Sequence, residues 1–253
     1  MGKIITVANQ KGGVAKTTTA VNLSAGLAAL GKKVLLIDLD PQGNATSGVG
    51  INKAEIKHCV YDALINEIPL NGIVQKTALD TLFAVPATIQ LAGAEVELVS
   101  MLSREMKLKK ALLPIKGKYD YIIIDCPPSL GLLTLNAMTA ADCLLIPIQC
   151  EYYALEGLSQ LMSTISLVKK HLNPSLDILG VALTMFDVRT NLSTQVVEEV
   201  RAYFKELVFE TIIQRNIRLS EAPSYGKPII LYDAKSKGAE NYNELAKEVI
   251  QRD

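Results

Sequence analysis

Short apolar runs alternate with amphipathic segments along most of the chain. The runs lack polar alternation, which is typical of strands that are buried on both faces. They cover residues 3–8, 33–38, 119–125, 143–149 and 178–185, and apolar residues at helical spacing occur at 19–30, 154–171, 192–205 and 238–252. Strands that alternate with helices form parallel sheets with helices on both faces. The sequence therefore predicts an α/β fold built on a mostly parallel, twisted sheet.

Two regions are less regular. Residues 60–113 are predicted as short helices around a strand near Thr81–Val85, and the segment 95–113 has an apolar face for packing. The last segment, 238–252, carries Glu240, Glu244 and Glu248 opposite its apolar face. A helix that lies on a membrane has a basic polar face. We therefore expect this last segment to pack on the core.

Length and charge limit the class of protein and its partners. A chain of 253 residues fits one α/β domain and contains no linker-like stretch, so we predict a single domain over residues 1–253. Lys plus Arg equals Asp plus Glu at 26 each, so any nucleic-acid surface must be a local patch. No apolar stretch reaches the roughly 18 residues of a membrane span, and nothing resembles a signal peptide. These features predict a cytoplasmic protein.

The cysteines do not suggest a metal site. Cys59, Cys126, Cys143 and Cys150 have neither C-x-x-C spacing nor histidine companions. Three of them occur in apolar runs, and we expect these to be small buried residues in a reducing compartment.

A glycine-rich stretch at residues 9–18 lies between the first predicted strand and the first predicted helix. A loop in that position directs backbone N–H groups and the positive end of the helix to one spot, which suits phosphate. Lys16 can reach β- and γ-phosphates, and the Thr17 hydroxyl can bind Mg²⁺. Lys11 is a second lysine, which an ordinary phosphate loop does not need. The predicted nucleotide-binding residues are Lys11, Gly12, Gly13, Val14, Ala15, Lys16, Thr17 and Thr18.

Ala15 stands where the usual phosphate loop has glycine. Glycine allows close approach to the phosphates and a positive φ. If the position needs a positive φ, alanine adds about 1–2 kcal/mol of strain. Two interpretations stay open: weaker nucleotide binding or turnover, and a loop that relaxes around one methyl group.

Carboxylates follow two of the predicted strands. Asp38 and Asp40 come at the end of residues 33–38, and Asp125 ends residues 119–125. The carboxyl ends of parallel strands form the rim where α/β sheets bind ligands. A single aspartate at a strand end more often caps a turn, but in combination with the phosphate loop Asp125 is predicted to hold Mg²⁺.

Basic residues gather in the carboxyl-terminal third of the chain. They are Arg189, Arg201, Arg215 and Arg218, with Lys205 and Lys227. Scattered surface arginines are usually only solvated, but a patch of several cations can bind DNA phosphate without reading bases. The residues alone leave both interpretations open.

The chain resembles the ParA/Soj partition ATPases of the MinD–ParA group, which have a deviant phosphate loop. The resemblance rests on the loop at residues 11–18 and on motifs that extend to the carboxyl-terminal third. These motifs are Asp38–Asn44, Asp125–Leu130, Gln149–Gly157 and Arg218–Ser224. The resemblance implies a P-loop NTPase fold of the SIMIBI type and a switch that binds ATP, hydrolyses it slowly to ADP and acts in chromosome or plasmid partitioning.

The resemblance also implies roles for single residues in a homodimer that holds two ATP molecules between its subunits. Lys11 contacts the partner's nucleotide, and Lys16 binds the β- and γ-phosphates. Thr18 contacts the α-phosphate, Thr17 binds Mg²⁺ with Asp125 behind it, and Asp40 positions the attacking water. The family's Pro-x-Asn adenine contact is here Gln214-Arg215-Asn216, which keeps the asparagine but not the proline.

Partners are implied as well. Arg189 and Arg218 align with the arginines by which the family binds double-stranded DNA non-specifically, which places the ATP-bound dimer on the nucleoid. A centromere-binding protein resembling ParB is implied as the activator of hydrolysis.

Two alternatives remain. One is a nucleotide-gated DNA-binding regulator whose hydrolysis is impaired by Ala15. The other is a MinD-like ATPase on a membrane, which needs a basic amphipathic tail that the sequence does not show. A GTPase is disfavoured because no Asn-Lys-x-Asp guanine motif occurs.

Overall fold

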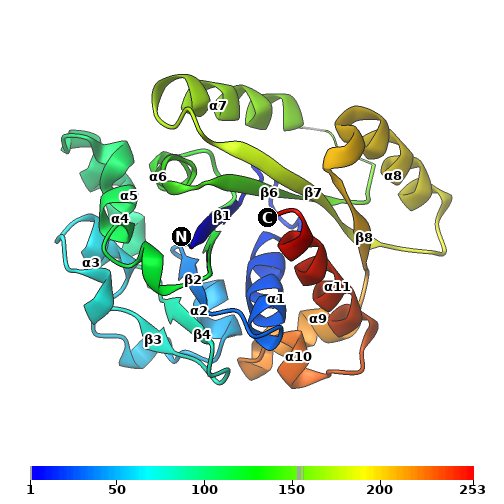
Figure 1. Ribbon diagram of the computed structural model, residues 1–253, viewed down its shortest axis with the longest axis horizontal. Coiled ribbons are helices and arrows are strands. Elements are labelled where there is room, and N and C mark those ends of the chain that lie inside the picture. The colour runs from blue at the N-terminus through cyan, green and yellow to red at the C-terminus, as the bar shows by residue number, and fades with distance from the viewer. Residues whose placement is uncertain (1, 153–154, 156) are drawn as a thin grey trace.

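One sheet runs through the part of the chain that this computed structural model describes, residues 2–152, 155 and 157–253 (Figure 1). Its strands are β1 (Lys3–Val7), β2 (Val34–Asp38), β3 (Gln75–Lys76), β4 (Leu82–Val85), β5 (Tyr121–Asp125), β6 (Cys143–Gln149), β7 (Asp177–Phe186) and β8 (Val208–Gln214). Their order is β3-β4-β2-β5-β1-β6-β7-β8, and only β3 and β4 pair antiparallel among the described strands. The predicted α/β fold with a mostly parallel sheet is confirmed.

Helices cover both faces of this sheet (Figure 1). They are α1 (Lys16–Ala29), α2 (Asn44–Gly48), α3 (Val60–Leu64), α4 (Leu91–Glu97), α5 (Lys107–Leu112), α6 (Leu132–Ala140), α7 (Leu158–His171), α8 (Asn191–Phe204), α9 (Ile217–Glu221), α10 (Ile229–Tyr232) and α11 (Lys237–Gln251). In β5, Ile122 and Ile124 point into one core with α6 and α7, whereas Ile123 points into the other with α1 and α11. This burial on both sides explains the unbroken apolar runs of the central strands.

Some boundaries differ from the sequence predictions. Helix α1 begins at Lys16 rather than at residue 19, because the phosphate-loop residues themselves form its first turn. Strands β3 and β8, at the two edges of the sheet, were not predicted. Helix α7 begins at Leu158, and the predicted start near residue 154 falls among residues 153, 154 and 156, outside the described part of the chain.

The carboxyl-terminal helix packs on the core as predicted. Tyr242, Leu245 and Val249 of α11 are fully buried, and the Tyr242 hydroxyl is 3.1 Å from the Thr19 hydroxyl on α1. The apolar face that a membrane would need is therefore covered. Among the described residues, no helix combines the length and the apolar character required to cross a bilayer.

Candidate functional site: a nucleotide cleft

The carboxyl ends of three central strands meet at one edge of the sheet. Strand β5 lies between β1 and β2, and its last residue, Asp125, pairs with Val7 on one side and with Asp38 on the other. The loops that follow these strands therefore emerge side by side. This is the rim where open α/β sheets bind ligands.

The loop after β1 folds back on itself before α1 begins. The Lys16 Nζ atom donates a hydrogen bond to the Lys11 carbonyl oxygen at 2.7 Å. Gly13 has a φ of 76°, and Ala15 has a φ of 65° and a ψ of 32°. The position before the lysine thus adopts the left-handed conformation that glycine tolerates best. Ala15 carries about 1–2 kcal/mol of backbone strain in this conformation.

A cleft of about 670 Å³ opens over this loop. It is lined by Gly12, Gly13, Ala15, Lys16, Thr17 and Thr18 of the loop, by Asp40 after β2 and by Pro128 after β5, together with further residues after β2 and β4 and with Met185 of β7. The structure therefore brings together most of the predicted phosphate-binding residues. Lys11 and Val14 do not line the cleft: Val14 is buried, and Lys11 is half-buried.

Asp125 is fully buried. Among the described residues, no donor lies at hydrogen-bond distance and angle from either carboxylate oxygen. Burial raises the pKa of this carboxyl well above its ordinary value, and Asp38 raises it further, whereas the Thr17 hydroxyl and the Lys16 ammonium lower it. A buried carboxylate without a partner is costly unless a cation compensates it. Asp125 and Thr17 therefore fit Mg²⁺, which prefers oxygen ligands and commonly takes one carboxylate plus substrate phosphates.

The two aspartates at the end of β2 and in the loop after it, Asp38 and Asp40, have different surroundings. Asp38 accepts hydrogen bonds from the Thr46 backbone nitrogen at 2.8 Å, the Thr46 hydroxyl at 2.7 Å and the Asp40 nitrogen at 3.1 Å. Burial nevertheless raises the pKa of Asp38 to about 6. Asp40 accepts from the Gln42 nitrogen at 2.9 Å and lines the cleft. Asp38 therefore anchors the loop, and Asp40 is the carboxylate that faces the cleft.

Lys16 is almost completely buried, at 6% exposure. Burial lowers the pKa of its ammonium group, while Asp125, Cys126 and Asp40 raise it. The surrounding carboxylates thus favour the charged form that a phosphate group requires.

A pocket of about 300 Å³ adjoins the cleft, at the carboxyl ends of β7 and β8. It shares Ala15, Thr18 and Met185 with the cleft. Gln214 and Asn216, the predicted adenine segment, both line it. Met185 was not predicted as a site residue, because nothing in an apolar strand sequence distinguishes its last residues from the core.

Arg189 lies on the loop after β7, and Arg218 lies on α9, which follows the neighbouring strand β8; both are at the same edge of the sheet as the cleft. Arg189 donates two hydrogen bonds to Asp187, at 2.9 and 2.7 Å. Arg218 pairs with Glu221 at 2.9 Å and with Asp233 at 3.6 Å. Both arginine side chains are exposed and outside the cleft, and each already has a carboxylate partner.

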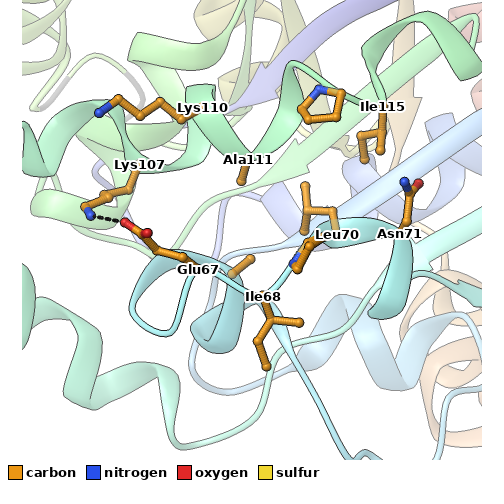
Figure 2. A pocket seen from close by; sticks show the side chains of 11 residues that line it. Glu67, Ile68, Leu70, Asn71, Lys107, Lys110, Ala111 and Ile115 are labelled. Atoms are coloured by element: carbon orange, nitrogen blue, oxygen red, sulfur yellow. Dashed lines mark hydrogen bonds and ion pairs between the residues drawn. The ribbon is translucent and has the colours of Figure 1, made fainter.

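Another pocket, of about 390 Å³, lies away from the phosphate loop, between α5 and the segment after α3 (Figure 2). Leu70, Ala111 and Ile115 form an apolar wall, and Lys107 donates to Glu67 at 2.8 Å at one end. None of the predicted site residues lines this pocket. The candidate site is therefore the cleft over the phosphate loop.

Known proteins are similar to this chain over nearly its whole length. A family model described as an AAA domain matches residues 2–178. The chain is 65% identical to the sporulation initiation inhibitor protein Soj of Bacillus subtilis over 249 residues, which cover 98% of each chain. It is 61% identical to the chromosome partitioning protein ParA of Myxococcus xanthus over 253 residues, which cover 100% of this chain and 89% of that one. The chain belongs to the Soj/ParA family of chromosome-partitioning ATPases.

A solved structure agrees with the fold. A Mycobacterium smegmatis protein named cobyrinic acid a,c-diamide synthase, crystallised with ADP and magnesium, has a TM-score of 0.88 and 39% identity. The match covers 99% of this chain and 95% of that one. Its name gives a different activity, and the family assignment rests on the two partitioning proteins, whose identity to this chain is higher.

Proposed function

We propose that this chain binds ATP with Mg²⁺ in the cleft and hydrolyses it slowly, as the switch of a chromosome- or plasmid-partitioning system. The observation that carries the proposal is the buried Asp125 carboxylate, which is close to Thr17 and Lys16. Among the described residues, no donor makes a hydrogen bond of acceptable distance and angle to it. A lysine, a hydroxyl and a buried carboxylate at the start of a helix are the parts that phosphoryl transfer in phosphate-loop enzymes uses.

Each residue of the loop has a role in this proposal. Backbone N–H groups of Gly12–Thr18 surround the phosphates, Lys16 contacts the β- and γ-phosphates, and Thr18 contacts the α-phosphate. Thr17 binds Mg²⁺ with Asp125 behind it. Bound Mg²⁺ neutralises charge that develops on the transferred phosphoryl group. Asp40, which lines the cleft, orients the attacking water.

The adenine lies in the adjoining pocket. The Asn216 side-chain oxygen accepts a hydrogen bond from the Arg218 nitrogen at 2.8 Å, where it caps α9. The amide NH₂ of Asn216 is therefore the group left to donate to the base. Gln214 lines the same pocket in place of the family's proline.

Two copies of the chain form the active state. Lys11 does not line the cleft of its own chain, which supports a role at the nucleotide of a second subunit. A lysine from the partner adds positive charge where the triphosphate needs it, so that ATP favours the dimer and ADP does not.

The ATP-bound dimer binds double-stranded DNA non-specifically through Arg189 and Arg218, and this binding holds it on the nucleoid. The placement of both arginines at the same edge of the sheet supports a shared surface. Guanidinium groups suit phosphate contacts that carry no sequence information. A ParB-like centromere-binding protein stimulates hydrolysis and returns the chain to the monomer.

Binding of ATP with Mg²⁺, measured by calorimetry, tests the nucleotide site. Lys16→Ala and Asp125→Asn should both lose ATP affinity, by at least roughly tenfold, because each removes a charged partner of the triphosphate or its metal. Lys110→Ala, at the distant pocket of Figure 2, is the matched control and should bind as the wild type does. Failure of the wild type to bind ATP with Mg²⁺ would refute the proposal.

A second function, the nucleotide-gated DNA-binding regulator, is favoured by the positive φ of Ala15. Strain in the phosphate loop can slow turnover without abolishing binding. Phosphate release in the presence of DNA and a ParB-like protein separates the two functions. Phosphate release that these partners stimulate indicates an enzyme. No phosphate release at saturating ATP indicates a regulator.

A further inference from the structure

A β-bulge interrupts β7 beside the nucleotide cleft. Leu183 pairs with Ile212 and Phe186 with Gln214, so β7 contains one residue more than β8 between these two pairs. Met185 lies within this extra length and has a φ of 54°. A long side chain at positive φ is a rare, strained conformation, and such outliers gather at functional sites. Bulges beside active sites commonly redirect a side chain.

The bulge is connected to the phosphate loop through Thr184. This fully buried residue donates its hydroxyl hydrogen to the Val14 carbonyl oxygen at 3.2 Å, across 170 positions of sequence. Its own carbonyl oxygen accepts from the Cys150 nitrogen at 2.9 Å. The residues after Val14 and Thr184 are Ala15 and Met185, and both adopt positive φ. These contacts hold Met185 next to the phosphate loop.

Met185 also lies where the cleft over the phosphate loop meets the smaller pocket. Of the described residues, Ala15, Thr18 and Met185 line both the cleft over the phosphate loop and the smaller pocket at Gln214 and Asn216. Ala15 offers one methyl group, and Thr18 belongs to the loop and the first turn of α1. Met185 is therefore the one long apolar side chain of the three at this junction. A thioether side chain is adaptable in shape and makes favourable contacts with aromatic rings.

We propose that Met185 is a positioning residue that packs against the nucleoside of the bound nucleotide, between its base and its phosphates. The inference rests on the proposed function, because it requires a nucleotide in the cleft. The bulge directs the side chain to the junction, and the contact fixes the base and ribose relative to the triphosphate. Met185 thereby favours a nucleoside triphosphate over a bare polyphosphate.

Binding of ATP with Mg²⁺ and of inorganic tripolyphosphate with Mg²⁺ tests this assignment. Met185→Ala keeps the backbone but removes the side chain, and should weaken ATP binding roughly tenfold while leaving tripolyphosphate binding unchanged. Met185→Leu restores apolar volume and should bind ATP within about twofold of the wild type. Met101→Ala is the control. Met101 is half-buried and packs on the core that lies on the face of the sheet opposite α1, so this variant should change neither the ATP affinity nor the tripolyphosphate affinity.

Two results would overturn the assignment of Met185 but leave the proposed function intact. One is a Met185→Ala chain that binds ATP as tightly as the wild type. The other is an equal loss of ATP and tripolyphosphate binding, which would mean that the side chain only shapes the phosphate loop. Met185→Gly, which also removes the positive-φ strain, should show the same selective loss and serves if the alanine variant does not fold. A wild type that binds neither ligand would overturn the proposed function together with this assignment.

Discussion

At the scale of single residues, Ala15 and Met185 beside the nucleotide cleft adopt the left-handed conformation without being glycine. Strain of this kind persists only where the surrounding structure holds it in place. At Ala15 that structure is the phosphate loop, closed by the hydrogen bond from Lys16 to the Lys11 carbonyl. The sequence could predict that Ala15 is unusual, because the loop motif is contiguous. It could not predict Met185, whose conformation depends on how β7 pairs with β8.

We expect Ala15→Gly to raise the free energy of unfolding by about 0.5–1 kcal/mol, because relief of the strain exceeds the extra chain entropy of glycine. ATP binding should also tighten, since no methyl group then limits the approach of the loop to the phosphates. Denaturant unfolding and ATP titration measure the two effects. Ala202→Gly, at an exposed position inside α8, is the control and should lose about 1 kcal/mol instead. Equal affinity, hydrolysis and stability in the wild type and Ala15→Gly would contradict the account.

The cysteines give a prediction about pH. All four are free and buried, whereas burial was predicted for three of them, and burial raises the pKa of Cys143 and of Cys150 to about 12 from an ordinary value of 9.0. The folded state therefore keeps these protons at a pH where the unfolded state has lost them. Their contribution to stability is complete below pH 9 and decreases as the pH rises towards 12.

Denaturant unfolding between pH 8 and pH 10 checks this expectation. The free energy of unfolding should fall above pH 9, and it should fall less steeply in the Cys143→Ala/Cys150→Ala double variant. The same slope in both proteins would show that other groups cause the alkaline loss.

At the scale of elements, the central strands could be predicted because they are apolar on both faces, whereas the edge strands could not. Strand β8 includes the polar pair Glu210 and Thr211. Their backbone nitrogens donate to the Glu248 carboxylate on α11, at 2.9 and 2.7 Å. The helix thus satisfies polar groups of the edge strand through a tertiary contact that no local pattern reveals.

The loop after β7 and helix α9 after β8 carry the residues expected to contact DNA, Arg189 and Arg218. The Arg189→Glu/Arg218→Glu double variant should lose DNA binding, because it replaces two phosphate-binding cations by anions at the same edge of the sheet. ATP binding and dimer formation should remain, since both side chains lie outside the cleft. Arg201→Glu, at an exposed arginine on α8 paired with Glu210, is a control that reverses the charge of one arginine outside these two positions. Filter binding with non-specific duplex DNA and ATP measures the effect, and undiminished retention of the double variant would refute the assignment.

At the scale of the whole molecule, the site is assembled from loops that are far apart in sequence. The phosphate loop, Asp40 and Asp125 could be predicted from sequence because each lies at or just after the end of an apolar strand, and the parallel sheet brings those strand ends together. The adjoining pocket depends on the pairing of β7 with β8 and on α9, so its shape could not be predicted. Pairing of two copies stays a prediction that rests on Lys11.

The most direct test of the central claim, that a bound triphosphate in the cleft drives pairing of two copies, is the mass in solution. Light scattering coupled to gel filtration should give one chain with ADP and two chains with ATP and Mg²⁺, with Asp40→Ala used to slow hydrolysis. Lys11→Ala should bind ATP but stay a single chain. A single-chain mass for the wild type and for Asp40→Ala at saturating ATP and Mg²⁺ would contradict the account.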